Sequence, residues 1–275
     1  MPEVVLPEED KTPKAGAAAQ SEHNIPAPPE KRPLEMVDHQ AIGVFENAMP
    51  LDICKAVIAS FESWYSRKYI VNDSIKNTVM AEDENGEPIV SSIDTGFAGD
   101  KQFPQGSLGR KDTQLFLETH DKSMALALSQ WLGDCFRIYT ETYKGVTEGD
   151  PLSSWTYKIQ KTPPGGGYHV WHCEDSGFLY RDRVLTWMVY LNDIPVENGG
   201  ATDFFHQKLS LQPKAGTIVF WPAAYTHMHR GSFLTGDTAK YIATGWFLRE
   251  PGAVSERIIS EKLGTMPVLD QLNKC

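Results

Sequence analysis

Cysteine is scarce in this 275-residue chain, and its four copies lie far apart with no Cys-x-x-Cys pair. That spacing excludes the common thiolate zinc motifs, and it indicates reduced thiols in a cytoplasmic protein. Long apolar runs are also missing, since no stretch approaches the roughly 20 residues that cross a bilayer. The first residues, MPEVVLPEEDK, are acidic where a secretory signal is basic. We therefore expect neither secretion nor a membrane partner.

Basic residues are in deficit as well, because 26 Lys and Arg stand against 36 Asp and Glu, for a net charge of −10. An excess of negative charge disfavours a broad contact with nucleic-acid phosphates or an anionic membrane. We therefore expect no nucleic-acid partner. The sequence leaves the oligomeric state open.

Residues 1–40 lack Phe, Trp and Tyr, and they hold seven of the 18 prolines and eight acidic against four basic side chains. Such a segment cannot bury enough apolar area to offset the entropy of ordering it. We predict a disordered tail there, one domain over residues 41–250, and a C-terminal extension over residues 251–275. The apolar content of 41% is ample for the core of that domain.

The first part of the domain has helical periodicity. Residues 42–45 are typical of a short strand, and a helix with Pro50 near its first turn runs to about Lys68. A second helix spans about residues 121–143. Between the helices, residues 70–112 have no sustained period, which is typical of a functional loop or an insertion. The apolar stripes expected in the core are Ile53, Val57, Ile58, Phe61, Trp64 and Tyr65 in the first helix, and Met124, Leu128, Trp131, Cys135, Ile138 and Tyr139 in the second.

From about residue 151 the helical period disappears, and short β-rich segments follow one another between turn signals. Eight such strands suit a jelly roll, or double-stranded β-helix, in which two antiparallel sheets pack together. We therefore predict a mainly β fold with flanking helices (α+β), with helical support and a loop at residues 41–150 and a jelly-roll core at residues 151–250. The predicted strands are residues 154–161, 168–174, 183–192, 201–205, 209–212, 216–221, 227–231 and 240–248.

A histidine and a carboxylate stand two residues apart in the second of these strands, as His172-Cys173-Glu174. On an extended strand, side chains at i and i+2 leave the same face about 6.7 Å apart, so His172 and Glu174 can share one ion. The seventh strand offers a third ligand in His229 or in His227, which has the same parity. Two imidazoles and one carboxylate, with other positions open, are the ligands of non-haem Fe(II) oxygenases.

Oxidation of a C–H bond at such a centre needs electrons that no side chain here provides, so a sacrificial 2-oxo acid is the natural co-substrate. Its distal carboxylate needs a cation. Strand alternation puts Lys240 on one face with Ile242, Thr244 and Trp246. If that face is inward, Lys240 pairs with the carboxylate and Thr244 adds a hydrogen bond. The alternative is an exposed lysine at the start of a strand.

In this order the residues resemble the 2-oxoglutarate and Fe(II)-dependent dioxygenases, in particular the prolyl 4-hydroxylase-like branch. That family has His-x-Asp, an apolar strand, Gly-Gly-x-Thr-x-Phe, Lys-x-Gly-x-x-x-x-Trp, a distal His, and a Lys followed six residues later by Trp. The resemblance covers about residues 155–249. The corresponding elements are His172-Cys173-Glu174, residues 184–191, Gly199-Gly200-Ala201-Thr202-Asp203-Phe204, Lys214-Ala215-Gly216-Thr217-Ile218-Val219-Phe220-Trp221, His229, and Lys240 with Trp246.

The resemblance implies an enzyme in which Fe(II) binds to His172, Glu174 and His229. It also implies that 2-oxoglutarate chelates the metal and is oxidised to succinate and carbon dioxide while a substrate is hydroxylated. Ascorbate is a candidate stimulant. A prolyl peptide, a free amino acid and another small metabolite all fit as the substrate. The candidates for lining the cavity are Trp171, Trp246 and Arg230, and a structural salt bridge suits Arg230 equally well.

Two positions depart from the family pattern. Glu174 stands where the family usually has Asp, and the tyrosine that commonly touches the co-substrate on the first strand has no clean counterpart. By position Lys161 or Gln160 lies near it, and we take Lys161 as a cofactor-binding candidate. We prefer His229 to His227 because it stands one residue from the usual ten-residue spacing to the lysine. The alternative from another class is a non-catalytic jelly roll that binds a metal or a ligand.

Overall fold

The computed structural model describes residues 34–66, 110–117, 121–154, 156–177 and 180–249, together with the backbone of four short strands between residues 72 and 89. The predicted C-terminal extension, most of the predicted tail and most of the predicted long loop lie outside the described residues. No helix in the described part combines the length and the apolar character needed to cross a membrane.

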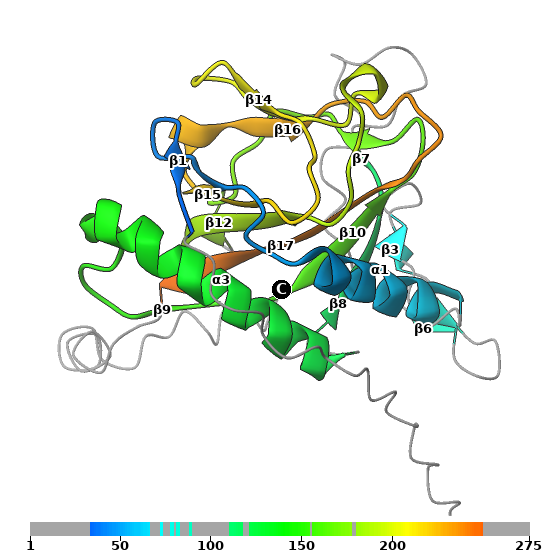
Figure 1. The fold of residues 1–275 in the computed structure, drawn as a ribbon, viewed down its shortest axis with the longest axis horizontal. Helices are drawn as coiled ribbons and strands as arrows, with labels where there is room; N and C mark the ends of the chain where they lie inside the picture. Colours follow the sequence, from blue (N-terminus) through cyan, green and yellow to red (C-terminus); the bar gives the residue numbers. More distant parts are fainter. Residues whose placement is uncertain are drawn as a thin grey trace, which may run out of the picture.

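A ten-stranded antiparallel sheet is the middle layer of the fold (Figure 1). Its middle strands are long and apolar, and they make the most extensive pairings, as between β12 and β17. In spatial order the strands are β1 (Val37–Asp38), β2 (Gly43–Phe45), β15 (Ile218–Pro222), β12 (Arg183–Tyr190), β17 (Lys240–Arg249), β10 (Lys158–Thr162), β8 (Thr113–Phe116), β3 (Asn72–Asp73) and β4 (Thr78–Val79), and β9 (Leu152–Ser153) also pairs with β17.

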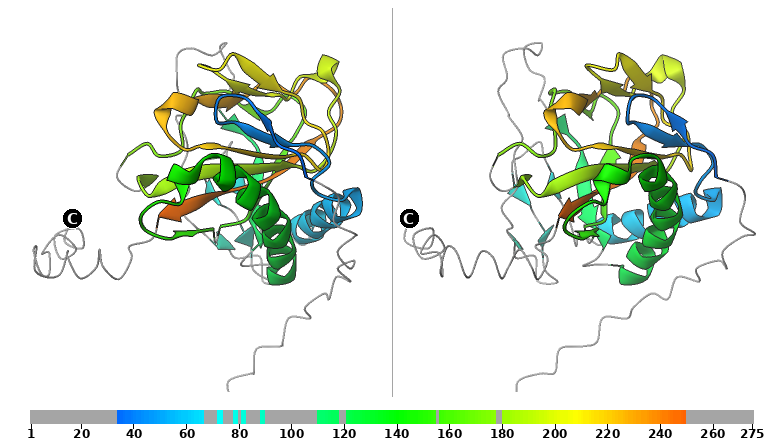
Figure 2. Two further views of the ribbon diagram at one scale, coloured as in Figure 1. Left: turned by 60° about the vertical axis from the view of Figure 1, so that its left-hand side comes forward. Right: turned by 90° about the vertical axis from the view of Figure 1, so that its left-hand side faces the viewer.

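A smaller antiparallel sheet lies across the large one, on the side away from the helices, as Figures 1 and 2 show. It consists of β14 (Leu209–Leu211), β13 (Thr202–Phe204) and β16 (His229–Gly231). Two further strand pairs are β11 (Gly167–Tyr168) with β7 (Arg110–Lys111), and β5 (Ala81–Glu82) with β6 (Pro88–Ile89). Two antiparallel sheets face to face are the architecture of a jelly roll. The predicted fold class is therefore confirmed.

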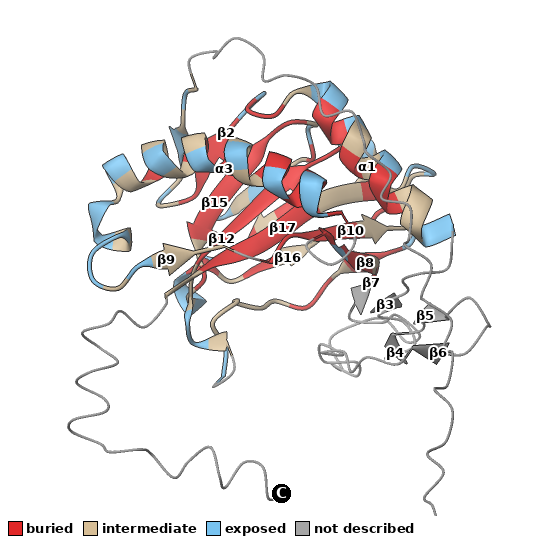
Figure 3. Ribbon diagram, turned by 90° about the horizontal axis from the view of Figure 1, so that it is seen from below, coloured by how far each residue is buried: buried red, intermediate tan, exposed pale blue. Residues whose placement is uncertain are grey.

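Two helices cover the outer face of the large sheet, namely α1 (Leu51–Ser66) and α3 (Lys122–Thr142). Figure 3 shows buried residues concentrated in the strands beneath them. Asp121 caps α3 by accepting a hydrogen bond from the backbone of Met124 at 3.1 Å, and it accepts another from Ser60 of α1 at 2.7 Å. One buried carboxylate therefore starts the second helix and ties it to the first. Both helices end within two residues of their predicted bounds. Three short helical turns also lie in the described part, namely η1 (Lys144–Val146), η3 (Val196–Asn198) and η4 (Tyr225–His227).

Side-chain alternation divides the core into two layers. On β12, Leu185, Trp187 and Val189 pack beneath the helices. Met188 and Tyr190 face the smaller sheet. The same division on β17 puts Ile242 between the sheets, as its predicted parity requires, so Lys240, Thr244 and Trp246 share the inner face.

Three predicted strands need correction. Of residues 168–174 only Tyr168 belongs to a strand, and His172 makes a single bridge to His229. His227 ends a helical turn, so the strand there begins at His229. The strand predicted from residue 154 begins at Lys158. In addition, β1 lies within the segment predicted to be a tail, so the folded domain begins before residue 41.

Replacing Gly199 by alanine is expected to destabilise the domain by about 2–4 kcal/mol. Gly199 has φ +66°, and a Cβ there would clash with the carbonyl oxygen of Phe233. Gly133, within α3, is the matched control because no atom lies within 4 Å of an added Cβ. Gly133→Ala is expected to stabilise the helix by about 0.5–1 kcal/mol. Urea unfolding measures both changes, and changes of the same sign would contradict this reading of the turn.

Candidate metal centre

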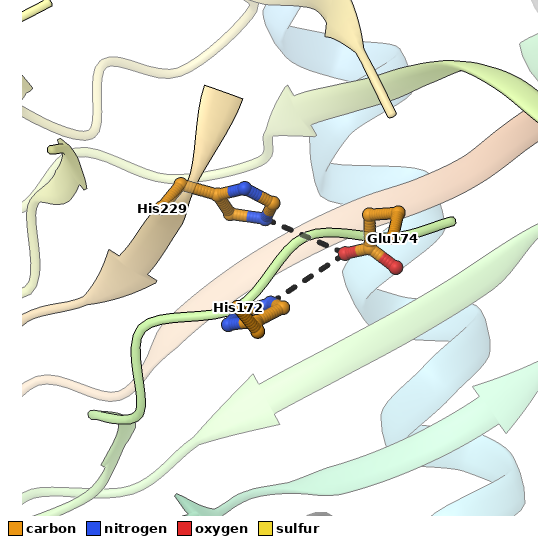
Figure 4. Close-up of side chains that lie close together, drawn as sticks. All are labelled: His172, Glu174 and His229. Atoms are coloured by element: carbon orange, nitrogen blue, oxygen red, sulfur yellow. Dashed lines mark ion pairs between the residues drawn. The ribbon is translucent and has the colours of Figure 1, made fainter. Parts of the chain in front are cut away.

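Three ligand-bearing side chains meet between the two sheets (Figure 4). His172 and His229 come together because their backbones form an antiparallel bridge, with N–O distances of 3.0 and 2.9 Å. Glu174 reaches the pair from two residues further on, since its backbone N–H donates to Ala223 at 2.8 Å and turns the chain. Its Oε1 lies 3.5 Å from Nε2 of His172 and 3.4 Å from Nε2 of His229. All three ligand atoms lie within 4.8 Å of one another.

Hydrogen bonds to the backbone fix which nitrogen of each ring faces the centre. Nδ1 of His172 lies 2.8 Å from the carbonyl oxygen of Val170, and Nδ1 of His229 lies 3.0 Å from that of His227. A carbonyl oxygen only accepts, so each Nδ1 carries the hydrogen, and Nε2 of a neutral ring has a free lone pair. This is how metal-binding histidines are oriented in proteins.

The pKa shifts favour a neutral ring at His172 and an ionised carboxylate at Glu174. Burial lowers the pKa of His172, and the neighbouring His229 lowers it further. Burial alone would raise the pKa of Glu174, but the close contacts of its Oε1 with the two histidine rings outweigh burial and hold that pKa well below its usual range, so the carboxyl group is ionised. Two bare nitrogens and an ionised oxygen within 3.5 Å repel one another unless a cation lies among them. The donor set therefore fits a divalent metal ion.

Residues 157–248 match the family model of the 2OG-Fe(II) oxygenase superfamily. Over these residues the chain is similar to that superfamily. No curated protein sequence matches the chain.

Three solved structures are similar in fold to about three quarters of this chain. A viral collagen prolyl hydroxylase from Paramecium Bursaria Chlorella virus-1 is 16% identical, with a TM-score of 0.50 over 77% of this chain and 97% of that one. A Pseudomonas putida prolyl-4-hydroxylase is 16% identical, with a TM-score of 0.52 over 76% and 93%. A Trichoplax adhaerens prolyl hydroxylase, in complex with a hypoxia inducible factor peptide fragment, is 14% identical, with a TM-score of 0.51 over 76% and 84%. At such identities the likeness concerns the fold.

Lys240 lies at the start of β17, within the residues that match the family model. Its Nζ donates to the carbonyl oxygen of Gly200 at 2.7 Å and lies 5.5 Å from the ring centre of Tyr190. Among the described residues no carboxylate lies within 4.0 Å of that nitrogen, although the more distant charge of Asp203 favours its protonation. Burial lowers the pKa of Lys240 to about 8. A buried ammonium group with one neutral partner suits an anionic ligand.

The other two cofactor candidates differ in position. Thr244 lies on the inner face, but its hydroxyl donates to the carbonyl oxygen of Trp187 at 2.8 Å and must turn before it can serve a ligand. Lys161 pairs with Tyr241 across β10 and β17, and its Nζ contacts Glu62 of α1 at 2.8 Å. Its side chain therefore lies on the helix-covered face, away from the metal centre, which corrects its predicted role. Gln160, the alternative, faces inward opposite Ile242.

His227, the alternative distal ligand, points away from the centre. Its Nε2 lies 3.0 Å from the carbonyl oxygen of Gln40 and its Nδ1 lies 3.0 Å from the hydroxyl of Thr226. Both ring nitrogens therefore have partners outside the ligand group. The parity argument fails here because η4 interrupts the strand.

The predicted cavity residues divide into two groups. Trp246 contacts the ligand group directly, since its Nε1 donates to Oε2 of Glu174 at 3.0 Å. Trp171 and Arg230 pack against each other beside the smaller sheet, with the guanidinium 4.5 Å from the ring centre. Arg230 also forms an ion pair with Asp203 at 3.2 Å, so the structural salt bridge considered for it is present. That Trp171 and Arg230 line a substrate cavity stays a prediction.

Sequence reasoning missed two residues near the centre. Arg183 donates to Oε2 of Glu174 at 3.1 Å, and Tyr190 lies beside Lys240 with its hydroxyl donating to Thr202 at 2.8 Å. Tyr190 was detectable by alternation along an apolar strand. Arg183 was detectable only as a charge at the start of that strand, because its direction depends on an irregularity in the pairing.

Proposed function

We propose that the chain is a 2-oxoglutarate-dependent Fe(II) dioxygenase that hydroxylates a small molecule or a peptide. The observation that carries the proposal is the convergence of two bare imidazole nitrogens on one oxygen of Glu174, at 3.4 and 3.5 Å. When bound, Fe(II) and 2-oxoglutarate supply the activation of dioxygen, with release of succinate and carbon dioxide and hydroxylation of a substrate C–H bond.

The residues of the chain divide the remaining work. His172, Glu174 and His229 hold the metal ion. Lys240 is proposed to bind the distal carboxylate of 2-oxoglutarate, because among the described residues its buried charge has a neutral carbonyl oxygen, and no carboxylate, within hydrogen-bond distance. Trp246 covers the centre from the large sheet and restricts the access of water, which protects a reactive site from side reactions.

The substrate proposal extends from peptides to small metabolites. Two of the similar structures are prolyl hydroxylases named for collagen or bound to a peptide fragment, which supports a prolyl peptide as the first substrate to test. We also propose that ascorbate stimulates turnover. A cytoplasmic location is proposed because the cysteines of the described part, Cys54, Cys135 and Cys173, are free thiols.

The proposal is tested by adding Fe(II) and then 2-oxoglutarate to the purified protein without oxygen. The expected result is a weak visible charge-transfer band that requires both additions, followed by succinate formation when oxygen is admitted. A protein that retains zinc, gives no band and forms no succinate is instead a non-catalytic metal-binding jelly roll. A panel of prolyl peptides and amino acids, followed by oxygen consumption above the uncoupled rate, then identifies the substrate class.

A further inference from the structure

We infer that Arg183 and Trp246 are positioning residues that hold Glu174 as a one-oxygen ligand, which is how this chain accommodates glutamate where the family motif has aspartate. The inference rests on the metal-binding part of the proposed function. It concerns the apo protein and its metal affinity, so it does not depend on the identity of the substrate.

The two oxygens of Glu174 have different surroundings. Oε1 faces the histidines, whereas Oε2 accepts from Nη1 of Arg183 at 3.1 Å and from Nε1 of Trp246 at 3.0 Å. A carboxylate oxygen has two lone-pair directions, so these two donors occupy Oε2. Oε1 is left as the oxygen available to a metal ion.

A glutamate needs such a restraint more than an aspartate does. Its extra methylene adds one rotatable bond, and a free side chain loses that rotational freedom when it binds a metal. Nη1 of Arg183 also donates to the backbone carbonyl oxygen of Glu174 at 3.2 Å. The guanidinium therefore links the end of the side chain to its own backbone and orients the carboxylate before the metal arrives.

An irregularity in the large sheet aims Arg183 at the centre. Leu185 pairs with Phe247 and packs beneath the helices, so regular alternation would put Arg183 on that outer face too. The register shifts between Arg183 and Leu185, and Arg183 pairs with Leu248 instead. Such a bulge reverses the face to which the preceding side chain points.

Aromatic rings then fix the guanidinium in place. Its Cζ lies 3.6 Å from the ring centre of Trp246 and 4.2 Å from that of Tyr180. Contacts of a guanidinium with ring faces are favourable. Trp246 therefore acts twice, as a hydrogen-bond donor to Glu174 and as the surface on which Arg183 rests.

The test is the affinity for Mn(II), measured from the EPR signal of free Mn(II) without co-substrate. Arg183→Gln and Trp246→Phe are each expected to weaken binding by roughly 10- to 100-fold, the usual effect of residues that orient metal ligands. Two matched variants control for general damage. Arg249→Gln removes an arginine whose hydrogen bonds in the described part go to backbone carbonyls, and Trp187→Phe removes an indole donor that bonds Ser154 on the outer face. Both controls are expected to bind Mn(II) within about twofold of the unaltered protein.

A double-mutant cycle separates positioning from a general stabilising role. In the Glu174→Asp background the carboxylate is drawn back from Arg183, so Arg183→Gln is expected to weaken Mn(II) binding by less than about threefold. Equal losses in both backgrounds, or equal losses in Arg183→Gln and Arg249→Gln, would overturn the inference. If the unaltered protein binds Mn(II) and Arg183→Gln binds it equally well, the positioning role is overturned while the proposed function stands. If the unaltered protein does not bind Mn(II), both the positioning role and the proposed function are overturned.

Discussion

His229→Ala is expected to lose metal binding and succinate formation, whereas His227→Ala, two residues away, is expected to keep both. Replacing a residue that only orients a metal ligand usually lowers metal affinity about 10- to 100-fold, so removing a ligand itself should weaken metal binding by more than about 100-fold. The reason lies in the direction of Nε2, which in His229 lies 3.4 Å from Glu174 Oε1. Alanine at position 229 leaves only His172 and Glu174 as ligands.

His227 is a demanding control because it is the same residue type, is also buried, and stands only two positions from His229. Its ring bonds Gln40 and Thr226, so His227→Ala should cost about 1–3 kcal/mol of folding stability through the loss of a buried ring and its hydrogen bonds. The bond that orients His229 survives, because it is accepted by the backbone carbonyl of His227.

Equilibrium dialysis with Mn(II) and an assay of succinate formation measure the pair of variants, and urea unfolding measures their stability. Loss of metal in His227→Ala with retention in His229→Ala would reverse the assignment of the distal ligand. Equal loss in both variants would indicate that the segment as a whole, and not one ring, holds the metal.

Periodicity predicted the parts of the fold that depend on local sequence. The apolar stripe starting at Met124 predicted α3 to within one residue at each end. Alternation along β17 put Lys240 and Trp246 on one face, and the structure shows that this face is the inner one, because the strand is paired along its length with β12 and β10.

Parity failed where the chain leaves the sheet. His172 and Glu174 were paired by strand geometry, yet they meet because the chain is bonded to β16 at His172 and to Ala223 at Glu174. Lys161 was chosen as the inward-facing residue where its neighbour Gln160 faces inward. The pairing of β10 with β17 decides which side chains of β10 point inward, and the sequence alone does not show that pairing. A bulge such as the one after Arg183 has no local sequence signature, so a single-residue shift in the pairing hid the contact between Arg183 and Glu174.

Lys240→Met is expected to weaken 2-oxoglutarate binding by roughly 100-fold or more, because the distal carboxylate would be buried without its cation. The affinity is measured without oxygen in the presence of Mn(II). Lys161→Met is the matched control, since the same change is made one strand away on the helix-covered face. The control should bind 2-oxoglutarate within about twofold of the unaltered protein and lose less than about 1 kcal/mol of stability.

The stability of the apo form of Lys240→Met distinguishes a lysine that binds a ligand from one that stabilises the fold. Because the pKa of Lys240 falls from 10.5 in the unfolded chain to about 8 when folded, the unfolded state binds more protons between these values. The stability of the unaltered apo protein therefore rises as the pH rises from about 8 towards 10.5, and the full destabilisation by the buried charge is present below pH 8. Lys240→Met removes that charge, so its apo Tm should exceed that of the unaltered protein near pH 7, and the difference should narrow towards pH 10. A lower Tm near pH 7 would indicate a structural role for Lys240.

Binding of 2-oxoglutarate should respond to pH with the opposite sign. The 2-oxoglutarate dianion binds the protonated lysine. Above the apo pKa of about 8, Lys240 must therefore take up a proton before the anion binds, and the free-energy cost of that protonation grows with each pH unit. The Kd for 2-oxoglutarate should then rise by up to about tenfold per pH unit above pH 8 in the unaltered protein. In Lys240→Met this dependence should disappear. The two pH dependences therefore have one cause, the buried charge of Lys240. That charge lowers the stability of the protein without a ligand and strengthens the binding of an anion.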